Sequence, residues 1–391
     1  MSPTTRLFTG RGRLLTPHPY DGELPWAVAV GDGRITYLGP ARGAPACDEV
    51  VDLAEALVTP GLVDAHTHPA FAGDRSDEAA ARLAGQRYDG GGILRTVDAT
   101  RAASDAELAA LVESRLRAQL AAGTTTVECK SGYGLSTEEE LRALRLIGEA
   151  GERVPVRVVR TFLGAHARPP DDVEYVTTLV EEMIPAVAEQ RAAEFCDVFC
   201  DAGFFSVEES ERILAAARSH GMGLRMHADQ LSRTGASELG VRLGATSIDH
   251  LEQLDGAGVA ALAGSTAVAT LLPGPALVLR DRLPPARALL DAGARVALAS
   301  DANAGTFGAW GAMPLVIGLG ATVLGMSVGE AVTAATQGGA HALGLDGRRG
   351  EIGPGADADL VAWDAEHEGA FALRLGAVGP GAVFVGGERV G

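Results

Sequence analysis

The sequence predicts an α/β protein: a (β/α)8 barrel of the TIM type, with a small β-sandwich domain formed from both chain ends. Two observations predict this fold. In the middle of the chain, eight apolar, β-branched runs alternate with charged segments of helical period. At both ends, short apolar runs alternate instead with turn residues, as in β-structure. A chain of 391 residues has room for one large barrel with an appendage.

The two chain ends are expected to form one composite domain, over residues 1–59 and 347–391. Near the start, WAVAVGDGRITYLGP holds two strand-like pieces around Gly31-Asp32-Gly33, which is a hairpin signal. Near the end, GEIGPGADADLVAWDA and AVFVGGERV have the same character. Because chain termini often lie close together, both ends can build one domain. Residues 60–346 then form the barrel.

Short strands and longer helices are predicted to alternate through the barrel. The strand runs are residues 57–66, 124–130, 156–166, 193–200, 223–229, 246–252, 267–273 and 295–303. The segments SDAELAALVESRLRAQLAAG and STEEELRALRLIGEAGER open with Ser or Ser-Thr before acidic residues, as helix N-termini prefer. The stretch from 69 to about 103 is too long for a turn, so it is expected to hold an active-site loop.

Composition argues against several partners and locations. The net charge of −18 repels phosphate backbones and anionic lipid, so neither nucleic acid nor membrane is an expected partner. The uncharged run Ala309–Gly329 could be considered for a membrane helix, but its glycines and proline favour a buried helix and loop. Four cysteines do not make a disulfide framework in so long a chain, and the N-terminus lacks a signal-peptide pattern. A homodimer in the reducing cytoplasm is expected.

Histidines gather at the ends of the predicted strands. Five of the nine in the chain lie there, together with one aspartate: His66, His68, His166, His227, His250 and Asp301. Active sites of such barrels lie at the C-terminal ends of the strands. Residues i and i+2 of a strand point to the same face, so His66 and His68 can both face the barrel mouth. With His227 and Asp301 they form a donor set that suits one Zn²⁺ or Fe²⁺ ion.

Each of these residues also has an ordinary structural interpretation. Taken alone, the histidines could be solvated loop or core residues, and Asp301 could be a helix cap. As part of a metal site, Asp301 would accept a proton from an activated water and deliver it to a leaving nitrogen. His250 could polarise a carbonyl or act as a base, or it could be a structural residue bonded to Asp249 or Glu252.

Motifs along nearly the whole chain resemble the amidohydrolase superfamily. VTPGLVDAHTH, the barrel pattern and the closing GEIGPGADADLVAWDA carry this resemblance. A second set of motifs is similar to the imidazolonepropionase family within it: AGDRSDEAAARLAG, GGGILRTVDATRAAS, ECKSGYGLS, TFLGAH, MHADQLSRTGA, DHLEQL and SDANAGT. The HxH motif marks only the superfamily, whereas SGYGL with HADQ and the GGGI loop is far more specific.

The resemblance implies an enzyme that hydrolyses the cyclic amide of 4-imidazolone-5-propanoate to N-formimidoyl-L-glutamate, in histidine degradation. One zinc or iron ion would be held by His66, His68, His227 and Asp301. Asp301 and His250 would be catalytic. The implied substrate contacts are Arg75, Tyr133, His166, Gln230, Asn303, Gly305 and Thr306. Arg75 would bind the propanoate carboxylate through two hydrogen bonds, unless it forms a surface salt bridge with Asp74 or Asp77.

Some residues depart from the pattern or leave alternatives open. The family usually has an Asn-Pro-Gly-like turn where this chain has Asn303-Ala304-Gly305, and bulkier apolar residues where it has Pro69-Ala70-Phe71. Lys130, the single lysine, is a carbamylated bridge between two metals, part of an ion pair, or the donor of a hydrogen bond near SGYG. The alternative activities are a purine- or pyrimidine-type aminohydrolase and a non-catalytic binding protein. Such deaminases often carry Glu where this chain has Gln230, and no ligand is missing.

Overall fold

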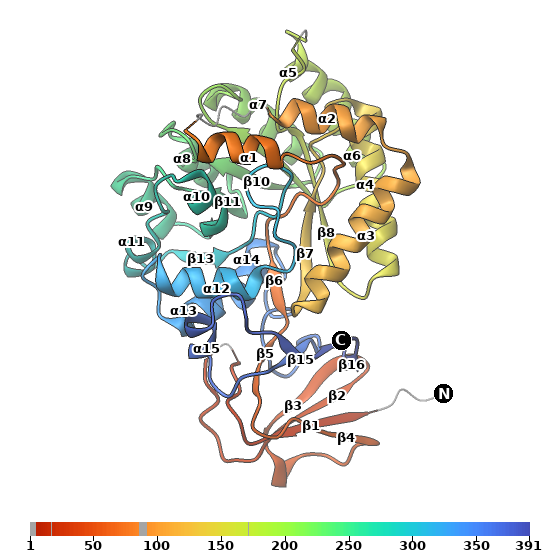
Figure 1. Cartoon of the computed structure of the whole chain (residues 1–391), viewed down its shortest axis with the longest axis vertical. Coiled ribbons are helices and arrows are strands. Elements are labelled where there is room, and N and C mark those ends of the chain that lie inside the picture. The colour runs from red at the N-terminus through yellow and green to blue at the C-terminus, as the bar shows by residue number, and fades with distance from the viewer. Residues whose placement is uncertain (1–4, 17, 86–91, 171) are drawn as a thin grey trace.

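A barrel of eight parallel strands forms the main body of the computed structural model, which describes residues 5–16, 18–85, 92–170 and 172–391. Helices surround the barrel, and two small sheets lie below it in Figure 1, beside both chain ends. This architecture confirms the predicted fold class. The division into domains at residues 59/60 and 346/347 stays a prediction.

The barrel strands follow one another in chain order, each parallel to the next. They are β6 (Leu62–Asp64), β7 (Thr124–Lys130), β8 (Arg157–Ala165), β9 (Phe195–Cys200), β10 (Gly223–Ala228), β11 (Ser247–His250), β12 (Val268–Leu271) and β13 (Arg295–Leu298). The first and last meet just beyond their ends, where His68 N donates to Ala302 O (2.9 Å) and Asp301 N donates to His66 O (3.0 Å). The barrel therefore closes at residues predicted to bind the metal.

Helices begin where the sequence supplies capping side chains. Ser104 accepts a hydrogen bond from Glu107 N at the start of α3 (Asp105–Ala121), and Ser136 accepts one from Glu139 N at the start of α4 (Thr137–Arg153). The other helices of the barrel region are α1 (Ser76–Leu83), α2 (Gly92–Ala102), α5 (Tyr175–Thr178), η2 (Leu179–Met183), α6 (Ile184–Glu189), α7 (Val207–Ser219), α8 (Ala236–Leu243), α9 (Gly256–Ala263), α10 (Pro273–Leu279), α11 (Ala286–Asp291), α12 (Met313–Thr322), α13 (Val328–Thr333), η3 (Ala334–Gly338) and α14 (Gly339–Ala342).

The small sheets combine segments from the two chain ends. One has the order β3-β2-β1-β4, from β1 (Arg6–Gly10), β2 (Trp26–Gly31), β3 (Arg34–Pro40) and β4 (Glu49–Asp52). The other has the order β16-β15-β14-β5, from β5 (Leu57–Pro60), β14 (Leu360–Trp363), β15 (Pro380–Val385) and β16 (Glu388–Arg389). The short helices η1 (Ala41–Gly43) and α15 (Gly369–Leu373) accompany them. The predicted hairpin is present: Asp32 and Gly33 have φ of 53° and 73°, which suits a type I′ turn.

The predicted first barrel strand, 57–66, is in fact two strands in different sheets. β5 pairs with β14 in the small sheet, whereas β6 pairs with β7 in the barrel. The break falls at Gly61, where a Cβ would lie 2.1 Å from the hydroxyl oxygen of Thr125. Only glycine allows the backbone to pass this side chain, so the chain changes sheets there.

The long stretch after β6 holds the two helices α1 and α2. They lie in the upper half of Figure 1, on the side of the barrel away from the small sheets. Gly90 and Gly91 of the GGGI motif lie outside the described residues, whereas Gly92 and Ile93 begin α2.

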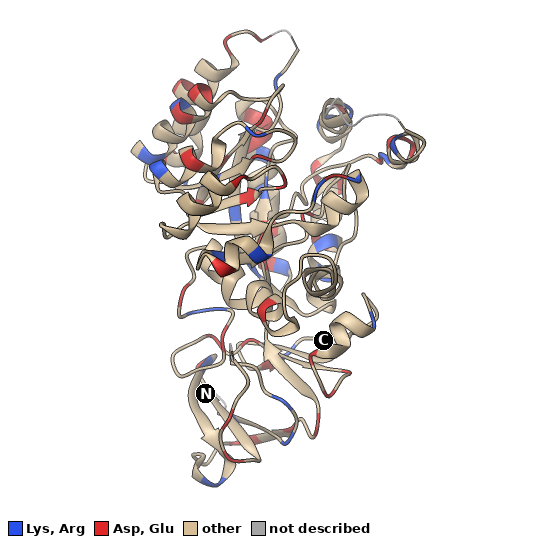
Figure 2. Cartoon of the chain, turned by 90° about the vertical axis from the view of Figure 1, so that its left-hand side faces the viewer, with Lys and Arg blue, Asp and Glu red and all other residues tan. Residues whose placement is uncertain are grey.

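The run Ala309–Gly329 folds as α12, most of whose residues are buried, followed by a loop and the start of α13. Among the helices of the described chain, none combines the length and apolarity needed to cross a membrane. All four cysteines are free thiols. Basic and acidic residues are interspersed over the barrel helices in Figure 2. Ion pairs one helical turn apart, such as Arg117–Glu113 and Arg145–Glu149, lie near the surface.

Contact between Phe8 of β1 and Phe384 of β15 joins the two small sheets, and with them the two chain ends. The rings are buried and meet edge to face, with centroids 4.8 Å apart. We expect Phe8→Ala and Phe384→Ala each to lower the free energy of unfolding by about 3–5 kcal/mol. The double variant should lose about 0.5–1.5 kcal/mol less free energy of unfolding than the two single variants lose together, because each single variant already removes the contact between the two rings. Urea denaturation of the four proteins measures this coupling.

The exposed Leu373 is the control for that cycle, since Leu373→Ala should change stability by no more than about 0.5 kcal/mol. Strictly additive losses for the two phenylalanines would contradict a core shared by both ends.

Candidate active site

The ends of the barrel strands surround one small cavity, of about 30 Å³. Its lining contains most of the site residues predicted from the sequence. The lining residues are His68, Arg75, Ile93, Tyr133, His166, Phe199, His227, Gln230, His250, Asp301, Asn303 and Thr306. Two predicted residues do not line it: His66 is fully buried beside His68, and Gly305 lies behind Arg75.

Two imidazoles and a carboxylate converge beside this cavity. His66 Nε2 lies 3.2 Å from His68 Nε2, and Asp301 Oδ1 lies 3.6 Å from the first and 3.3 Å from the second. Ligands about 2.0–2.1 Å from a tetrahedral Zn²⁺ are separated by about 3.3 Å, so this spacing suits a shared cation. His66 also belongs to a second close group of possible ligands, with His227 and His250.

Buried carboxylates orient two of these imidazoles from behind. Asp249 Oδ2 lies 2.6 Å from His66 Nδ1, and Asp197 Oδ1 lies 3.1 Å from His227 Nδ1. A carboxylate at Nδ1 holds the proton on that nitrogen and directs the lone pair to Nε2, the usual arrangement of metal-binding histidines. The His66 and His227 rings are therefore already in the tautomer that can bind a cation.

Two buried cations hold these carboxylates in place. Lys130 Nζ donates to Asp197 Oδ2 (2.7 Å) and to Glu128 Oε1 (2.9 Å). Arg225 Nη2 donates to Asp249 Oδ2 (3.0 Å) and to Ala65 O (2.6 Å), in the strand segment that leads to His66. All these side chains are fully buried. Lys130 is thus part of an ion-pair network beneath the imidazoles.

Burial keeps most of the imidazoles neutral. Burial, with the nearby charge of Lys130, holds the pKa of His66 and His68 well below the usual value. Burial also lowers the pKa of His227 to about 4, although Asp197 opposes the change, and that of His166 to about 3. A neutral imidazole offers its lone pair to a metal, so these values fit ligand roles.

The buried side chains around the His66, His68 and His227 rings carry an excess of negative charge, which a divalent cation would balance. Glu128, Asp197, Asp249 and Asp301 lie around the two buried cations Lys130 and Arg225, so acidic side chains outnumber basic ones here. Burying uncompensated charge is costly, and a divalent cation would offset this excess. The donor set therefore fits a divalent metal ion and does not select between zinc and iron.

His250 stands on the other side of the cavity and has its own acidic partner. Its Nδ1 lies 3.5 Å from Glu252 Oε1, and both side chains are buried. Burial is the largest single influence on the pKa of His250 and lowers it, but the charge and hydrogen bonding of Glu252, together with the charges of Asp301 and Asp249, raise that pKa above its usual value. His250 and Leu251 have φ of 80° and 71°, a strained conformation for non-glycine residues of the kind found at functional sites. Asp249, the other expected partner of His250, instead bonds His66.

The loop after β13 is held rigid by one asparagine. Asn303 Oδ1 accepts hydrogen bonds from Gly305 N (2.7 Å) and Thr306 N (2.8 Å), while its Nδ2 donates to Asp301 O (2.6 Å). Asn303 Nδ2 also donates to Thr306 Oγ1 (2.7 Å). The predicted substrate residues of this loop therefore have a fixed place relative to Asp301.

Two more buried carboxylates position predicted substrate residues. Glu140 of α4 accepts hydrogen bonds from the backbone N–H groups of Gly132, Gly134 and Leu135, each at 2.8 Å, and so fixes the loop that carries Tyr133. Asp201 accepts from Gln230 N at 3.1 Å, at the start of the loop that follows β10. His166 joins the first of these loops, because its Nδ1 lies 2.9 Å from Gly132 O.

Several residues of the site were not predicted from the sequence. Ile93 and Phe199 line the cavity as apolar walls, and Asp197 and Asp249 orient the imidazoles. Asp197 lies between the buried residues Cys196 and Val198 in an apolar strand. A charged residue in such a run is rarely buried without a partner, and this signal could have predicted a role for Asp197 in the site.

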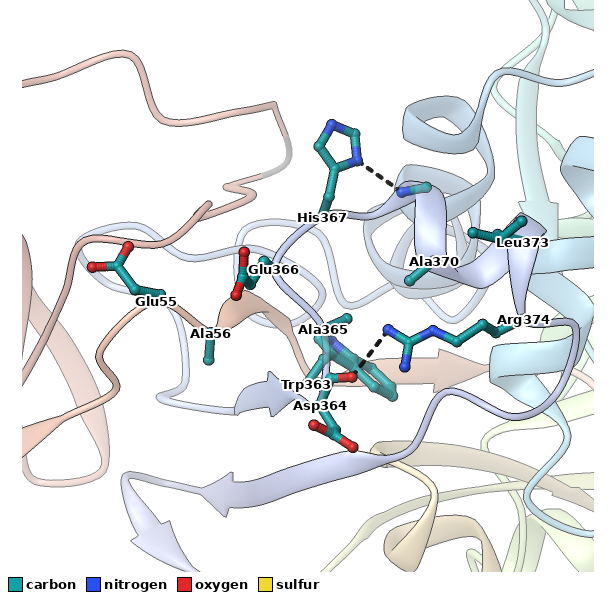
Figure 3. Close-up of a pocket in the computed structure, with 11 residues that line it drawn as sticks. Glu55, Ala56, Trp363, Asp364, Ala365, Glu366, His367, Ala370, Leu373 and Arg374 are labelled. Carbon is teal, nitrogen blue, oxygen red and sulfur yellow. Dashed lines mark hydrogen bonds between the residues drawn. The ribbon is translucent and has the colours of Figure 1, made fainter.

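A wider pocket of about 750 Å³ lies elsewhere, between β14 and α15 (Figure 3). It is lined by exposed acidic side chains, including Glu55 and Glu366, and by His367, whose Nδ1 accepts a hydrogen bond from Gly369 N (3.0 Å). Its lining includes none of the predicted site residues and no second histidine. The chemistry-bearing groups therefore belong to the smaller cavity at the barrel mouth.

Known proteins resemble this chain over nearly its whole length. The Amidohydrolase family matches residues 57–390. The imidazolonepropionase of Nocardia farcinica is 44% identical over 387 residues, which cover 96% of this chain and 95% of that protein. The imidazolonepropionase of Rubrobacter xylanophilus is 47% identical over 374 residues, covering 91% and 89%.

Solved structures of more distant relatives share the fold. The 5-methylcytosine deaminase from Klebsiella pneumoniae, liganded with 5-fluorocytosine, has a TM-score of 0.79 at 15% identity, covering 98% of this chain and 97% of that one. The N-isopropylammelide isopropylaminohydrolase from Burkholderia multivorans has a TM-score of 0.75 at 21% identity, covering 99% and 98%. At these identities the likeness concerns the fold alone. The sequence relatives decide the family: this chain belongs to the imidazolonepropionases of the amidohydrolase family.

Proposed function

We propose that the protein hydrolyses the cyclic amide of 4-imidazolone-5-propanoate to N-formimidoyl-L-glutamate, a step of histidine degradation. One observation carries the proposal: a single cavity brings together a metal-type donor set and the guanidinium of Arg75. A metal ion held by these donors can serve amide hydrolysis, and the guanidinium of Arg75 can bind a carboxylate of the substrate. The names of the relatives at 44% and 47% identity agree with this activity.

His66, His68, His227 and Asp301 would hold the metal ion. Bound there, a divalent cation supplies Lewis acidity, which polarises a carbonyl oxygen and activates water for attack. Asp301 is buried, and burial raises the pKa of its carboxyl group. A carboxylate with raised pKa is a better proton acceptor, so Asp301 can take a proton from the attacking water. It can then deliver that proton to the ring nitrogen as the C–N bond breaks.

His250 would stabilise the oxygen that gains negative charge at the attacked carbon. Its raised pKa favours the protonated ring, which donates a hydrogen bond and carries positive charge. Glu252 behind it would keep that charge in place. Removal of one such donor typically slows an enzyme by about 10²–10³-fold.

The remaining lining residues would bind the substrate. Arg75 can hold the propanoate carboxylate, and Tyr133 after β7 and His166 after β8 can add hydrogen bonds. Gln230 has both a donor and an acceptor for the ring amide. As an amide, it cannot shuttle protons as a glutamate can, which argues against an aminohydrolase. The cytoplasmic location and the homodimer stay predictions.

The first test is the consumption of imidazolone propanoate by the purified protein with and without a chelator. We expect turnover to fall to background when the metal is removed, because no residue of the cavity can replace its Lewis acidity. Zinc or ferrous iron added back should restore the rate. The metal content of each sample is measured in parallel. Undiminished turnover by metal-free protein would contradict the mechanism.

A second test removes the proton acceptor while keeping its shape. Asp301→Asn should lower kcat by about 10²–10⁴-fold, because an amide cannot carry the proton. The thermal unfolding midpoint and metal content show whether the fold and the metal remain. Asp291→Asn, at an exposed carboxylate of α11, serves as the matched control. Near-normal turnover by Asp301→Asn would remove Asp301 from the proposed proton transfer.

A further inference from the structure

The side chain of Arg75 is held by a glutamate one helical turn further on. Arg75 Nε donates to Glu78 Oε2 (2.8 Å) and Arg75 Nη2 donates to Glu78 Oε1 (2.7 Å). This paired geometry fixes the plane of the guanidinium as well as its position. The two acidic neighbours expected from the sequence, Asp74 and Asp77, do not take this role: Asp74 caps Ser76 N, and Asp77 pairs with Arg95.

Two glycines enclose the Arg75–Glu78 pair tightly. A Cβ on Gly92 would lie 1.8 Å from Glu78 Oε2 and 2.3 Å from Arg75 Nη2. A Cβ on Gly305 would lie 2.3 Å from Arg75 Nη1. A side chain at either position would therefore displace the Arg75–Glu78 pair, so the two glycines leave room for the guanidinium where it stands. The side chain of Arg75 is only 3% exposed.

A second arginine connects this pair to the loop after β13. Arg82 Nη1 donates to Glu78 Oε1 (2.6 Å), and Arg82 Nη2 donates to Gly305 O (2.6 Å). Since Asn303 fixes Gly305 relative to the backbone of Asp301, a continuous set of hydrogen bonds runs from the backbone carbonyl of Asp301, through Asn303, Gly305, Arg82 and Glu78, to Arg75. The distance from Arg75 to Asp301 is therefore fixed by the contacts of Glu78 and Arg82 at one end and by those of Asn303 at the other.

We propose that Glu78 is a specificity-determining positioning residue, which with Arg82 aims the Arg75 guanidinium at the carboxylate of the substrate side chain. The inference rests on the proposed function, because it concerns the same substrate. Amide hydrolysis needs the carbonyl group of the substrate ring beside Asp301. If Arg75 binds the substrate carboxylate at a fixed distance from Asp301, only a substrate whose side chain has the matching length places its ring there. A guanidinium that is no longer held in this plane binds the substrate carboxylate less tightly, so the loss of Glu78 is expected mainly in KM.

An opposite effect of Glu78 is also physically reasonable. Its carboxylate could compete with the substrate carboxylate for Arg75, and its removal would then tighten binding. If Glu78 positions Arg75, its removal raises KM, whereas if Glu78 competes with the substrate, its removal lowers KM. The variant Glu78→Gln therefore distinguishes the two effects.

The experiment compares wild type with Glu78→Gln, Arg82→Met and Arg75→Ala on two substrates: imidazolone propanoate, and an imidazolone that lacks the propanoate. We expect Glu78→Gln to raise KM for imidazolone propanoate by about 10- to 100-fold, with a much smaller change in kcat. Arg82→Met should raise this KM less than Glu78→Gln does, and Arg75→Ala should raise it at least as much as Glu78→Gln does. For the substrate without the carboxylate, kcat/KM should match wild type in Glu78→Gln and Arg82→Met.

Two further measurements exclude a merely structural effect. Calorimetric binding of unreactive imidazole propanoate should weaken in Glu78→Gln, while metal content and thermal unfolding midpoint stay at wild-type values. Glu113→Gln removes a comparable helical pair, that of Glu113 and Arg117 on α3, and should leave KM unchanged.

The failures of the two proposals can be told apart. If wild type does not consume imidazolone propanoate, the proposed function fails and this inference fails with it. If wild type is active and Arg75→Ala raises KM, but Glu78→Gln leaves KM unchanged or lowers it, only the role of Glu78 is overturned. Equal losses on both substrates would also overturn it, since that result reports general damage.

Discussion

The bond between Asp249 and His66 at the bottom of the barrel mouth is the interaction on which the rest of the site depends. At 2.6 Å, it fixes the ring and the tautomer of the first imidazole after β6. Ser247 Oγ, which also bonds Asp249, and Arg225 hold that carboxylate from two further directions. Replacing one member of so buried a network would leave an uncompensated charge, so the residues support one another. His66 Nε2 consequently faces His68 Nε2 with its lone pair available.

The two halves of the cavity are built differently, and the difference matches their tasks. The metal side stands on strand ends, where backbone hydrogen bonds and buried carboxylates leave the imidazoles little freedom. The substrate side comes mostly from loops, which single side chains hold together: Asn303 bonds within the loop after β13, and Arg82 of α1 bonds that loop at Gly305. A rigid cation site can be shared by a whole superfamily, while changes in the connecting loops alter the substrate.

Much of the barrel could be predicted because its signals are local. Ser104 and Ser136 mark helix starts, and each barrel strand is an apolar run bounded by turn residues. The histidines could be predicted to converge because parallel strands end at one rim of the barrel. The sheet change at Gly61 was missed, since β5 and β6 are both apolar and only one residue separates them.

The supporting contacts of the site could not be predicted in the same way. Asp249 is the strand neighbour of His227, yet it bonds His66 from a different strand. Which side chains meet across the barrel depends on strand tilt and register, which no local pattern encodes. Glu78 differs, because its spacing of three residues from Arg75 on a helix is a local signal. The sequence interpretation considered only Asp74 and Asp77 there, and the structure pairs Arg75 with Glu78.

The central claim is that buried carboxylates aim the imidazoles at a single divalent cation. It is tested most directly by measuring the zinc dissociation constant of wild type and of Asp249→Asn, by competition with a chromophoric chelator. The account predicts one tightly bound ion per wild-type chain, and binding weakened by about 10–100-fold in a variant that stays folded. A wild-type protein that binds no ion, or a folded Asp249→Asn that binds zinc as tightly as wild type, would contradict it.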